Sequence, residues 1–526
     1  MNRLMMIRGV AAIVFCIAFG TSMTAVAQET ELLGTLEGKL KWLEYRLTME
    51  RWDRAVGGSA DSLGFFEELF GYTLADAAIR PMIQKIESGT YDEEARRKAR
   101  IIEDLSMRYV VDGHQPVSGL LDSLRTMTGT QTGYLFEGED YAKTELEAVV
   151  AADPDRSRRE QAWRLLRSGQ DLADPMARLF RLRNQQARRE GFNSFFSMIM
   201  SSRAYSLDEY RSLLQRVDSG TREAYQSLLT RLKTRLRVDV VEPWDLEYAY
   251  RDVLAGIDIR LISDTIVPLA KATFDSIGVD ADELPIYYAF RDTTLAPVEF
   301  DYYPVRPPHD LRIAGSITGG HSNLKMLLAS LGQAMYGCHI HQEQALFSRP
   351  LQGAFGQSIG AFFRMIADDP RWLSEFAALP EQVTADFVSA RRDLALIELR
   401  FLLLWQYFEM EAYGDGSRDL NKLFWELYEK HLLMPRHEEI APWAAETDFA
   451  LWPGRHRDRL VGRLIAAQTW NYIERVNGSV IDNRDTRSFL IQNYFRFGRL
   501  YAWPELVKRG TGEALNPAYY IAYLGL

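Results

Sequence analysis

Residues 323–336 read Asn-Leu-Lys-Met-Leu-Leu-Ala-Ser-Leu-Gly-Gln-Ala-Met-Tyr. Apolar side chains recur along this stretch at intervals of three and four residues, which predicts an amphipathic helix with one buried face. These side chains are Leu324, Leu327, Leu328, Leu331 and Met335. Ala329 and Gln333 are four residues apart and share another face of the helix, with Ser330 beside them.

Most of the remaining sequence also predicts helices, because Arg, Glu, Leu and Gln are abundant. Pro is low, at 19, and concentrates at 285–308 and 435–453, which we predict to be irregular. Ser206 followed by Glu209 is a capping box, and Thr384 is the predicted start of a later helix. The main predicted helical regions are 141–190, 205–236, 384–413, 419–433, 456–476 and 484–499. β-Branched and aromatic residues predict short strands at 297–303 and 311–317. We therefore predict a mainly α fold with a very small β-sheet.

The composition excludes several classes of protein. The chain has 526 residues, of which 47% are hydrophobic and 12% aromatic, so it is neither disordered nor fibrous. Its formal charge of −10 gives no general attraction to phosphate backbones, which argues against nucleic-acid binding. Only Cys16 and Cys338 are present, so a disulfide framework is excluded. No linker or fixed repeat divides the chain, which favours one large unit.

The first 27 residues have the pattern of a secretory signal peptide. Arg3 and Arg8 precede an apolar run, and Ala25-Val26-Ala27 is a small-x-small cleavage pattern. The apolar run is shorter than the ~20 residues that span a bilayer. We expect export to the periplasm or the medium, with residues 28–526 forming the mature chain and no membrane span after cleavage.

The helix at 323–336 resembles the zinc-binding helix of the angiotensin-converting-enzyme-type and thimet-oligopeptidase-type metallopeptidases, whose pattern is Leu-Leu-His-Glu-x-Gly-His-Ala-x-Tyr. Here the same positions read Leu-Leu-Ala-Ser-Leu-Gly-Gln-Ala-Met-Tyr over 327–336. The two zinc-binding His positions therefore fall on Ala329 and Gln333, and the general-base Glu position falls on Ser330. The third zinc ligand of that family, a Glu, falls on Gln357 within Phe355–Gly360.

The similarity extends over roughly residues 285–526. Asp310-Leu311-Arg312-Ile313 looks like the strand that precedes the zinc helix, and 424–430 looks like a segment ahead of a substrate-contacting loop. In that loop the family's His position falls on Ala450 and its two Tyr positions fall on Arg457 and Leu460. Its Arg is kept, as Arg459.

The resemblance implies a helical peptidase fold with a deep central cleft between two halves, at 28–284 and 285–526. It implies that extended peptides add to the sheet edge at 297–303. Arg312, Tyr336 and Arg459 are the residues that we expect to line the cleft.

The same resemblance implies that zinc is absent. Zinc binds imidazole nitrogen, thiolate or carboxylate, whereas Ala329 has no donor atom and Gln333 and Gln357 have only neutral amides. Without the metal no water is activated, and Ser330 cannot act as a carboxylate base. We therefore expect no cofactor and an inactive peptidase homologue that binds a peptide or protein ligand.

Two other functions remain open. The first is an active hydrolase with an unconventional metal site, because His321, His339, His341 and Glu343 lie close together in the sequence. The second is a structural or assembly protein in which the cleft is filled. Stoichiometric zinc would favour the hydrolase, and the absence of any ligand would favour the structural role.

Overall fold

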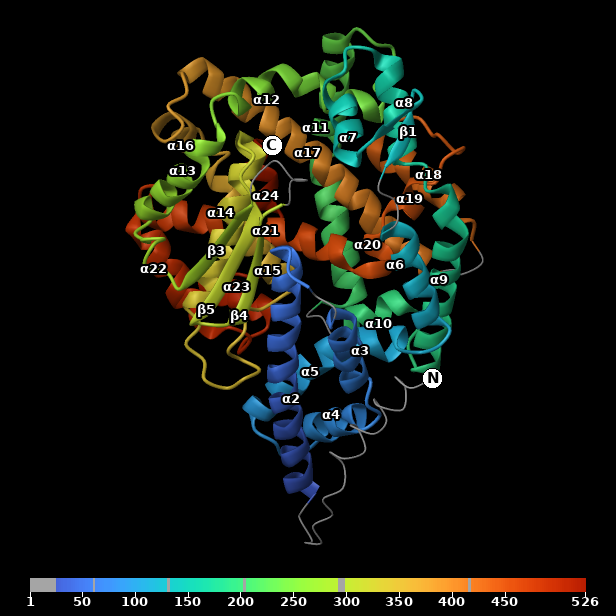
Figure 1. The fold of residues 1–526 in the computed structure, drawn as a ribbon, viewed down its shortest axis with the longest axis vertical. Coiled ribbons are helices and arrows are strands. Elements are labelled where there is room, and N and C mark those ends of the chain that lie inside the picture. Colours follow the sequence, from blue (N-terminus) through green and yellow to red (C-terminus); the bar gives the residue numbers. More distant parts are fainter. Residues whose placement is uncertain (1–24, 60–61, 130–132, 202–204, 292–298, 415–417) are drawn as a thin grey trace.

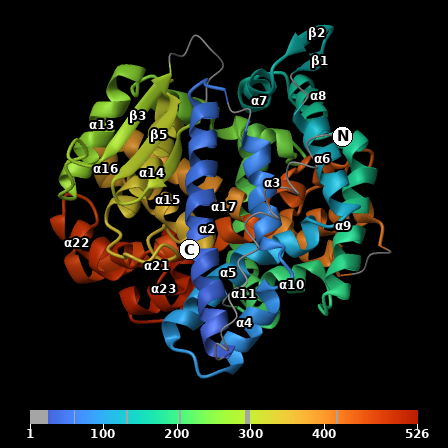
Figure 2. The same ribbon diagram turned by 60° about the horizontal axis from the view of Figure 1, so that its bottom comes forward.

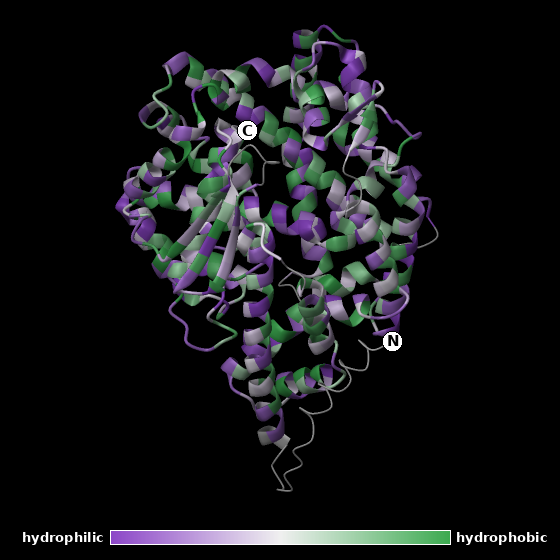
Figure 3. Ribbon diagram, viewed as in Figure 1, coloured by the Kyte–Doolittle hydropathy of each residue, from purple (hydrophilic) through white to green (hydrophobic). Residues whose placement is uncertain are grey.

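The computed structural model of this chain describes residues 25–59, 62–129, 133–201, 205–291, 299–414 and 418–526. These residues are 69% helix and 5% strand, in two small sheets, which confirms the predicted mainly α fold with very little β-structure (Figure 1). Polar and apolar residues alternate along the ribbons of most helices (Figure 3), as expected for amphipathic helices packed around a core. No helix in the described ranges has an apolar stretch long enough to cross a bilayer.

Four N-terminal helices form the lower part of the molecule in Figure 1. They are α2 (Ala25–Ala55), α3 (Leu63–Leu74), α4 (Ile79–Ser88) and α5 (Glu93–Asp112). Their apolar faces make a hydrophobic cluster of their own, which also includes Leu346 and Phe347. Figure 2 shows α2 and α3 side by side, with α2 in front of the sheet. Most of the predicted signal peptide, residues 1–24, lies outside the described residues, and the predicted cleavage site after Ala27 lies in the first turn of α2.

The next segment is helical, with one small hairpin. The elements are α6 (Val117–Gly129), β1 (Tyr134–Phe136), β2 (Glu139–Tyr141), α7 (Lys143–Ala152), α8 (Arg156–Leu166), α9 (Gln170–Arg189), α10 (Phe195–Ser201), α11 (Leu207–Leu236), α12 (Arg251–Asp258) and α13 (Ser263–Ser276), with short 3-10 turns at Pro243–Asp245 and Tyr248–Tyr250. The predicted capping box at the start of α11 is confirmed, because the Glu209 amide donates to Ser206 Oγ at 3.2 Å.

A three-stranded sheet comes before the helix that resembles the zinc helix. Its strands are β3 (Ile286–Arg291), β4 (Asp301–Arg306) and β5 (Asp310–Ser316), in the order β3-β5-β4. β3 is parallel to the central strand β5, and β4 is antiparallel to it. The two predicted strands correspond to β4 and β5, although 297–298 lie outside the described residues. β4 is an edge strand, as predicted, while β3 was not predicted.

The remaining elements are again helices. They are α14 (Gly320–Cys338), α15 (Ala354–Ile366), α16 (Pro370–Glu375), α17 (Glu381–Ala412), α18 (Leu420–Leu432), α19 (Pro442–Ala445), α20 (Asp448–Leu451), α21 (Arg455–Asn477), α22 (Arg484–Asn493), α23 (Trp503–Thr511) and α24 (Ala518–Tyr523), with a 3-10 turn at Phe495–Phe497. Thr384 does not start α17, contrary to prediction. The helix begins after Pro380, whose fixed φ fits a helix N-terminus, and Thr384 lies inside it.

The two sides of the molecule do not follow the predicted division at residue 284. In Figure 1 the sheet lies on one side with α13–α16 and α22–α24, while α6–α9 and α18–α20 lie on the other. A hydrogen bond joins this second side across the division, from the Ala441 amide to the Ser168 carbonyl at 2.8 Å. The helix α19 therefore packs against α9, and α20 against α6, both from the first half of the sequence.

Candidate functional site

The helices α14, α15 and α21 pack closely around two glycines. The five predicted apolar residues of α14 are all buried, which confirms the predicted buried face of this helix. A Cβ atom on Gly332 of α14 would lie 2.0 Å from the Phe363 ring of α15. A Cβ atom on Gly462 of α21 would lie 2.8 Å from Cβ of Gln357. Because only glycine permits these approaches, α15 is held tightly between α14 and α21.

Two of the predicted zinc-ligand positions face the same point on α15. A Cβ atom on Gly360 would lie 3.5 Å from Nε2 of Gln333 and 3.6 Å from Cβ of Ala329. Gln357 lies one helical turn before Gly360 and packs toward α21. Ala329 and Ser330 are both only 3% exposed. The structure therefore brings Ala329 and Gln333 next to the turn that carries Gln357, and none of the three supplies a zinc donor.

An arginine lies at the same point. Nη2 of Arg364, on the turn of α15 after Gly360, is 3.5 Å from the Gly360 Cβ position. Its Nε is buried without a hydrogen-bond partner. Burial lowers the pKa of Arg364, and Arg463 and Arg459 add to this shift, while Glu398 and Glu299 oppose it. A guanidinium still remains charged in a protein, so a cation with an unsatisfied Nε lies beside Ala329 and Gln333.

Three arginines on α21 extend this cationic region. Arg455, Arg459 and Arg463 are spaced four residues apart, so they share one face of the helix. Asp448 accepts from Arg455 at 3.0 Å and pairs with Arg459 at 3.1 Å. Arg463 pairs with Glu398 of α17 at 2.5 Å. Each of these arginines therefore has a direct ion pair, although Arg455 and Arg459 share one carboxylate.

A second cationic group lies near Glu398. Lys325 of α14 and Arg391 of α17 both pair with Asp368, which follows α15. Burial opposes ionisation of Glu398, but Arg463, Arg391 and Lys325 together hold its pKa below the usual value. Burial also lowers the pKa of Lys325 to about 8, even though Asp368 favours its charged form.

The structure places the three predicted cleft residues in different surroundings. Arg312 of β5 pairs with Asp310 at 2.9 Å and lies over the Trp52 ring of α2. Arg459 is one of the three arginines on the shared face of α21 and pairs with Asp448. Tyr336 is only 1% exposed, and its hydroxyl donates to the Gly498 carbonyl at 3.1 Å and accepts from a backbone amide. The Tyr336 side chain is therefore part of the core and does not line a cleft, contrary to prediction.

The four residues of the alternative metal site do not meet. His321 lies at the start of α14 and His339 directly after its end, which separates them by ~27 Å at ~1.5 Å per residue. Nε2 of His321 lies 2.9 Å from the Ala367 carbonyl, and Nδ1 of His339 lies 2.8 Å from the Met335 carbonyl. His341 and Glu343 are exposed. The prediction that these residues form one metal site is wrong, because the helix holds them apart.

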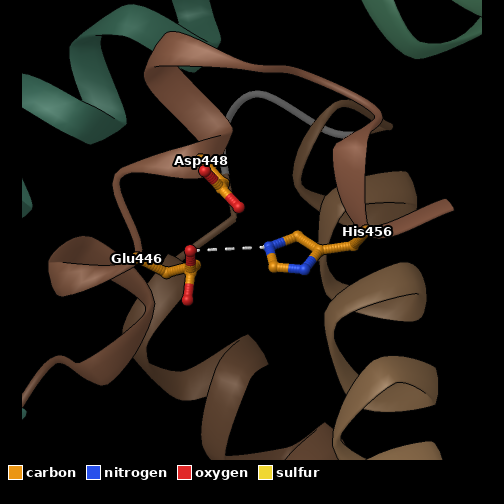
Figure 4. A group of neighbouring side chains, drawn as sticks. All are labelled: Glu446, Asp448 and His456. Atoms are coloured by element: carbon orange, nitrogen blue, oxygen red, sulfur yellow. Dashed lines mark ion pairs between the residues drawn. The ribbon is translucent and has the colours of Figure 1, made fainter. Parts of the chain in front are cut away.

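A different group of residues comes together beside Arg455 and Arg459 of α21. Among the described residues, the only three-residue group with metal-ligand atoms close together is Glu446, Asp448 and His456, whose atoms all lie within 4.8 Å of one another (Figure 4). Burial, reinforced by Arg459 and Arg455, lowers the pKa of His456 to about 3, so its imidazole is neutral at neutral pH.

Sequence reasoning missed this group. The signal was two acids two residues apart, with a histidine eight residues after the second, at the start of the predicted helix 456–476. The short helices α19 and α20 and the start of α21 bring these residues together, and no helical or strand period predicts that arrangement.

Comparison of the chain with protein-family models and with curated proteins finds no match in either.

Proposed function

We propose that this chain is an exported, non-catalytic relative of the helical zinc metallopeptidases that binds a peptide, or a peptide segment of a protein partner, at the junction of α14, α15 and α21. The observation that supports this proposal best is the Arg364 guanidinium, whose buried Nε has no hydrogen-bond partner and which lies beside Ala329 and Gln333. A free carboxylate is the group of a peptide that an arginine binds most strongly, often through two parallel hydrogen bonds.

The surroundings of Arg364 favour an anionic ligand. Arg463 and Arg459 lower the pKa of Arg364 while Glu398 and Glu299 raise it, so an incoming carboxylate would further offset the repulsion between the arginines. Arg364 is only partly buried, which leaves part of the side chain accessible. Ala329, Gln333 and Gln357 offer no group that would activate water for hydrolysis. The junction is therefore suited to binding and not to cleavage.

A peptide-library binding experiment tests the proposal. Peptides with free C-terminal carboxylates and their C-terminally amidated forms are titrated against the purified full chain. Arg364→Met should weaken binding of the free acids by about ten- to a hundredfold, since a charged hydrogen bond contributes ~1.5–3 kcal/mol. Arg475→Met, which removes an exposed arginine on α21, is the matched control and should bind as the wild type does.

The other outcomes separate the alternatives. Equal binding of acids and amides, or full binding by Arg364→Met, would show that the arginine does not anchor the ligand. No binding of any peptide would favour a structural or assembly role. Cleavage of the peptides would favour an active hydrolase. N-terminal sequencing of the secreted chain tests export, and the expected first residue is Gln28.

A further inference from the structure

The group formed by Glu446, Asp448 and His456 has the composition of a metal site. Glu446 follows α19, Asp448 begins α20 and His456 is the second residue of α21, so three separate elements supply the side chains. Nε2 of His456 lies 3.7 Å from Oε1 of Glu446, and both carboxylates point toward the imidazole in Figure 4. Metal bonds of ~2.0–2.2 Å to such donors require only a small contraction of the group.

His456 supplies an independent observation that points to a ligand. The residue is only 2% exposed, and neither of its ring nitrogens has a hydrogen-bond partner. The ring is stacked on Trp405 at 5.8 Å and packs against Phe449 at 5.2 Å, so its position is fixed. Buried polar atoms are nearly always satisfied in native proteins. A metal ion bound to Nε2 would satisfy one of these nitrogens.

The charges around the group determine which metal it suits. Arg455 and Arg459 pair with the two oxygens of Asp448, at 3.0 and 3.1 Å, and so hold this carboxylate in position. They also offset the negative charge of the site. Ca²⁺ and Mg²⁺ bind through many oxygen ligands, which this site lacks. An imidazole with two carboxylates instead suits first-row transition metals, Zn²⁺ included.

We propose that Glu446, Asp448 and His456 bind a divalent transition-metal ion of the zinc class. Three protein donors leave one coordination position of a tetrahedral ion for water or a ligand. This site is separate from the α14–α15 positions where the family resemblance places zinc, and from His321, His339, His341 and Glu343, so zinc bound here does not favour the hydrolase alternative.

Metal titration of the purified full chain tests this proposal. The protein is first treated with a chelator and then titrated with Zn²⁺, Co²⁺, Mg²⁺ or Ca²⁺, with bound metal measured by equilibrium dialysis. We expect one Zn²⁺ per chain, a visible absorption band from bound Co²⁺, and no comparable binding of Mg²⁺ or Ca²⁺. Binding of no transition metal, or equal binding of Ca²⁺ and Zn²⁺, would overturn the proposal.

Variants locate the bound metal. Glu446→Gln keeps the size of the side chain and should weaken Zn²⁺ binding at least about tenfold, and His456→Ala should abolish it. His341→Ala removes an exposed histidine and is the control, with wild-type binding expected. If His456→Ala does not fold, Glu446→Gln and the loss of the Co²⁺ band still decide the question. Unchanged binding in Glu446→Gln, or loss of binding in His341→Ala, would refute the assignment. Peptide binding in the chelated wild type tests the proposed function separately.

Discussion

His321 is a buried histidine whose titration has a measurable effect on stability. It is 5% exposed, and its ring meets the Phe387 ring edge-on at 4.8 Å. Burial is the largest effect on this group and lowers its pKa from 6.5 to about 4. Asp368 opposes this shift, while Lys325 and Arg391 add to it. Nε2 lies 2.9 Å from the Ala367 carbonyl, so the neutral ring donates there.

The sign and size of the effect follow from the two pKa values. Between pH 6.5 and 4 the unfolded chain takes up a proton on His321 that the folded chain does not. The stabilisation is therefore complete above pH 6.5 and is lost as the pH falls toward 4. A shift of this size corresponds to about 3 kcal/mol, since each pKa unit contributes ~1.4 kcal/mol. His321→Gln keeps an N–H donor but cannot titrate in this range.

Urea unfolding followed by circular dichroism, at pH 7.5, 5.5 and 4, measures the prediction. At pH 7.5 the variant should be less stable than the wild type, because the edge-on contact of the ring is lost. On going to pH 4, the free energy of unfolding of the variant should rise by about 3 kcal/mol relative to that of the wild type, which reduces or reverses the difference. His309→Gln removes an exposed imidazole and serves as the control. A difference that stays constant over this range would refute the reasoning.

Two further predictions concern buried groups near the site. Burial raises the pKa of Glu409 to about 7, so the stabilising neutral form is complete below pH 4.5 and is lost as the pH rises through 7. In urea unfolding, the stability of Glu409→Gln relative to the wild type should rise by about 3 kcal/mol on going from pH 4.5 to 8.5, unlike that of the control Glu223→Gln on the exposed face of α11. Gly332→Ala places a Cβ 2.0 Å from the Phe363 ring, so we expect a loss of about 1–3 kcal/mol or more in thermal unfolding. Gly34→Ala in α2, with nothing within 4 Å, should gain up to ~1 kcal/mol, and equal effects of the two glycine variants would contradict this packing.

The local structure was largely predictable from the sequence because it depends on local periodicity and capping. The apolar spacing of α14 identified its buried face, and Ser206 with Glu209 identified the start of α11. The strand β3 was missed because its parallel partner β5 follows only after the segment that contains β4. The division into two sides was also missed, since it depends on where α18–α20 pack in three dimensions.

The candidate sites were less predictable, because they depend on contacts between distant segments. In the sequence nothing distinguishes Arg364 from an ordinary surface charge on a helix. Only the packing of α14 against α15 places it beside Ala329. The reverse holds for His321 and His339, which look clustered in the sequence but lie at opposite ends of one helix. The rise of an α-helix is by itself enough to exclude these two histidines as ligands of the same ion.

The charge balance at the α14–α15 junction is consistent with the proposal that this site binds a ligand and no zinc. In the family that the sequence resembles, Zn²⁺ is balanced by two glutamates, the third ligand and the general base. Here the corresponding positions, Ala329, Ser330, Gln333 and Gln357, are all neutral and carry no net charge. Arg364 adds one positive charge beside them, with a buried Nε that has no hydrogen-bond partner. Because a partly buried charge is most stable when paired, an incoming carboxylate would complete this arrangement.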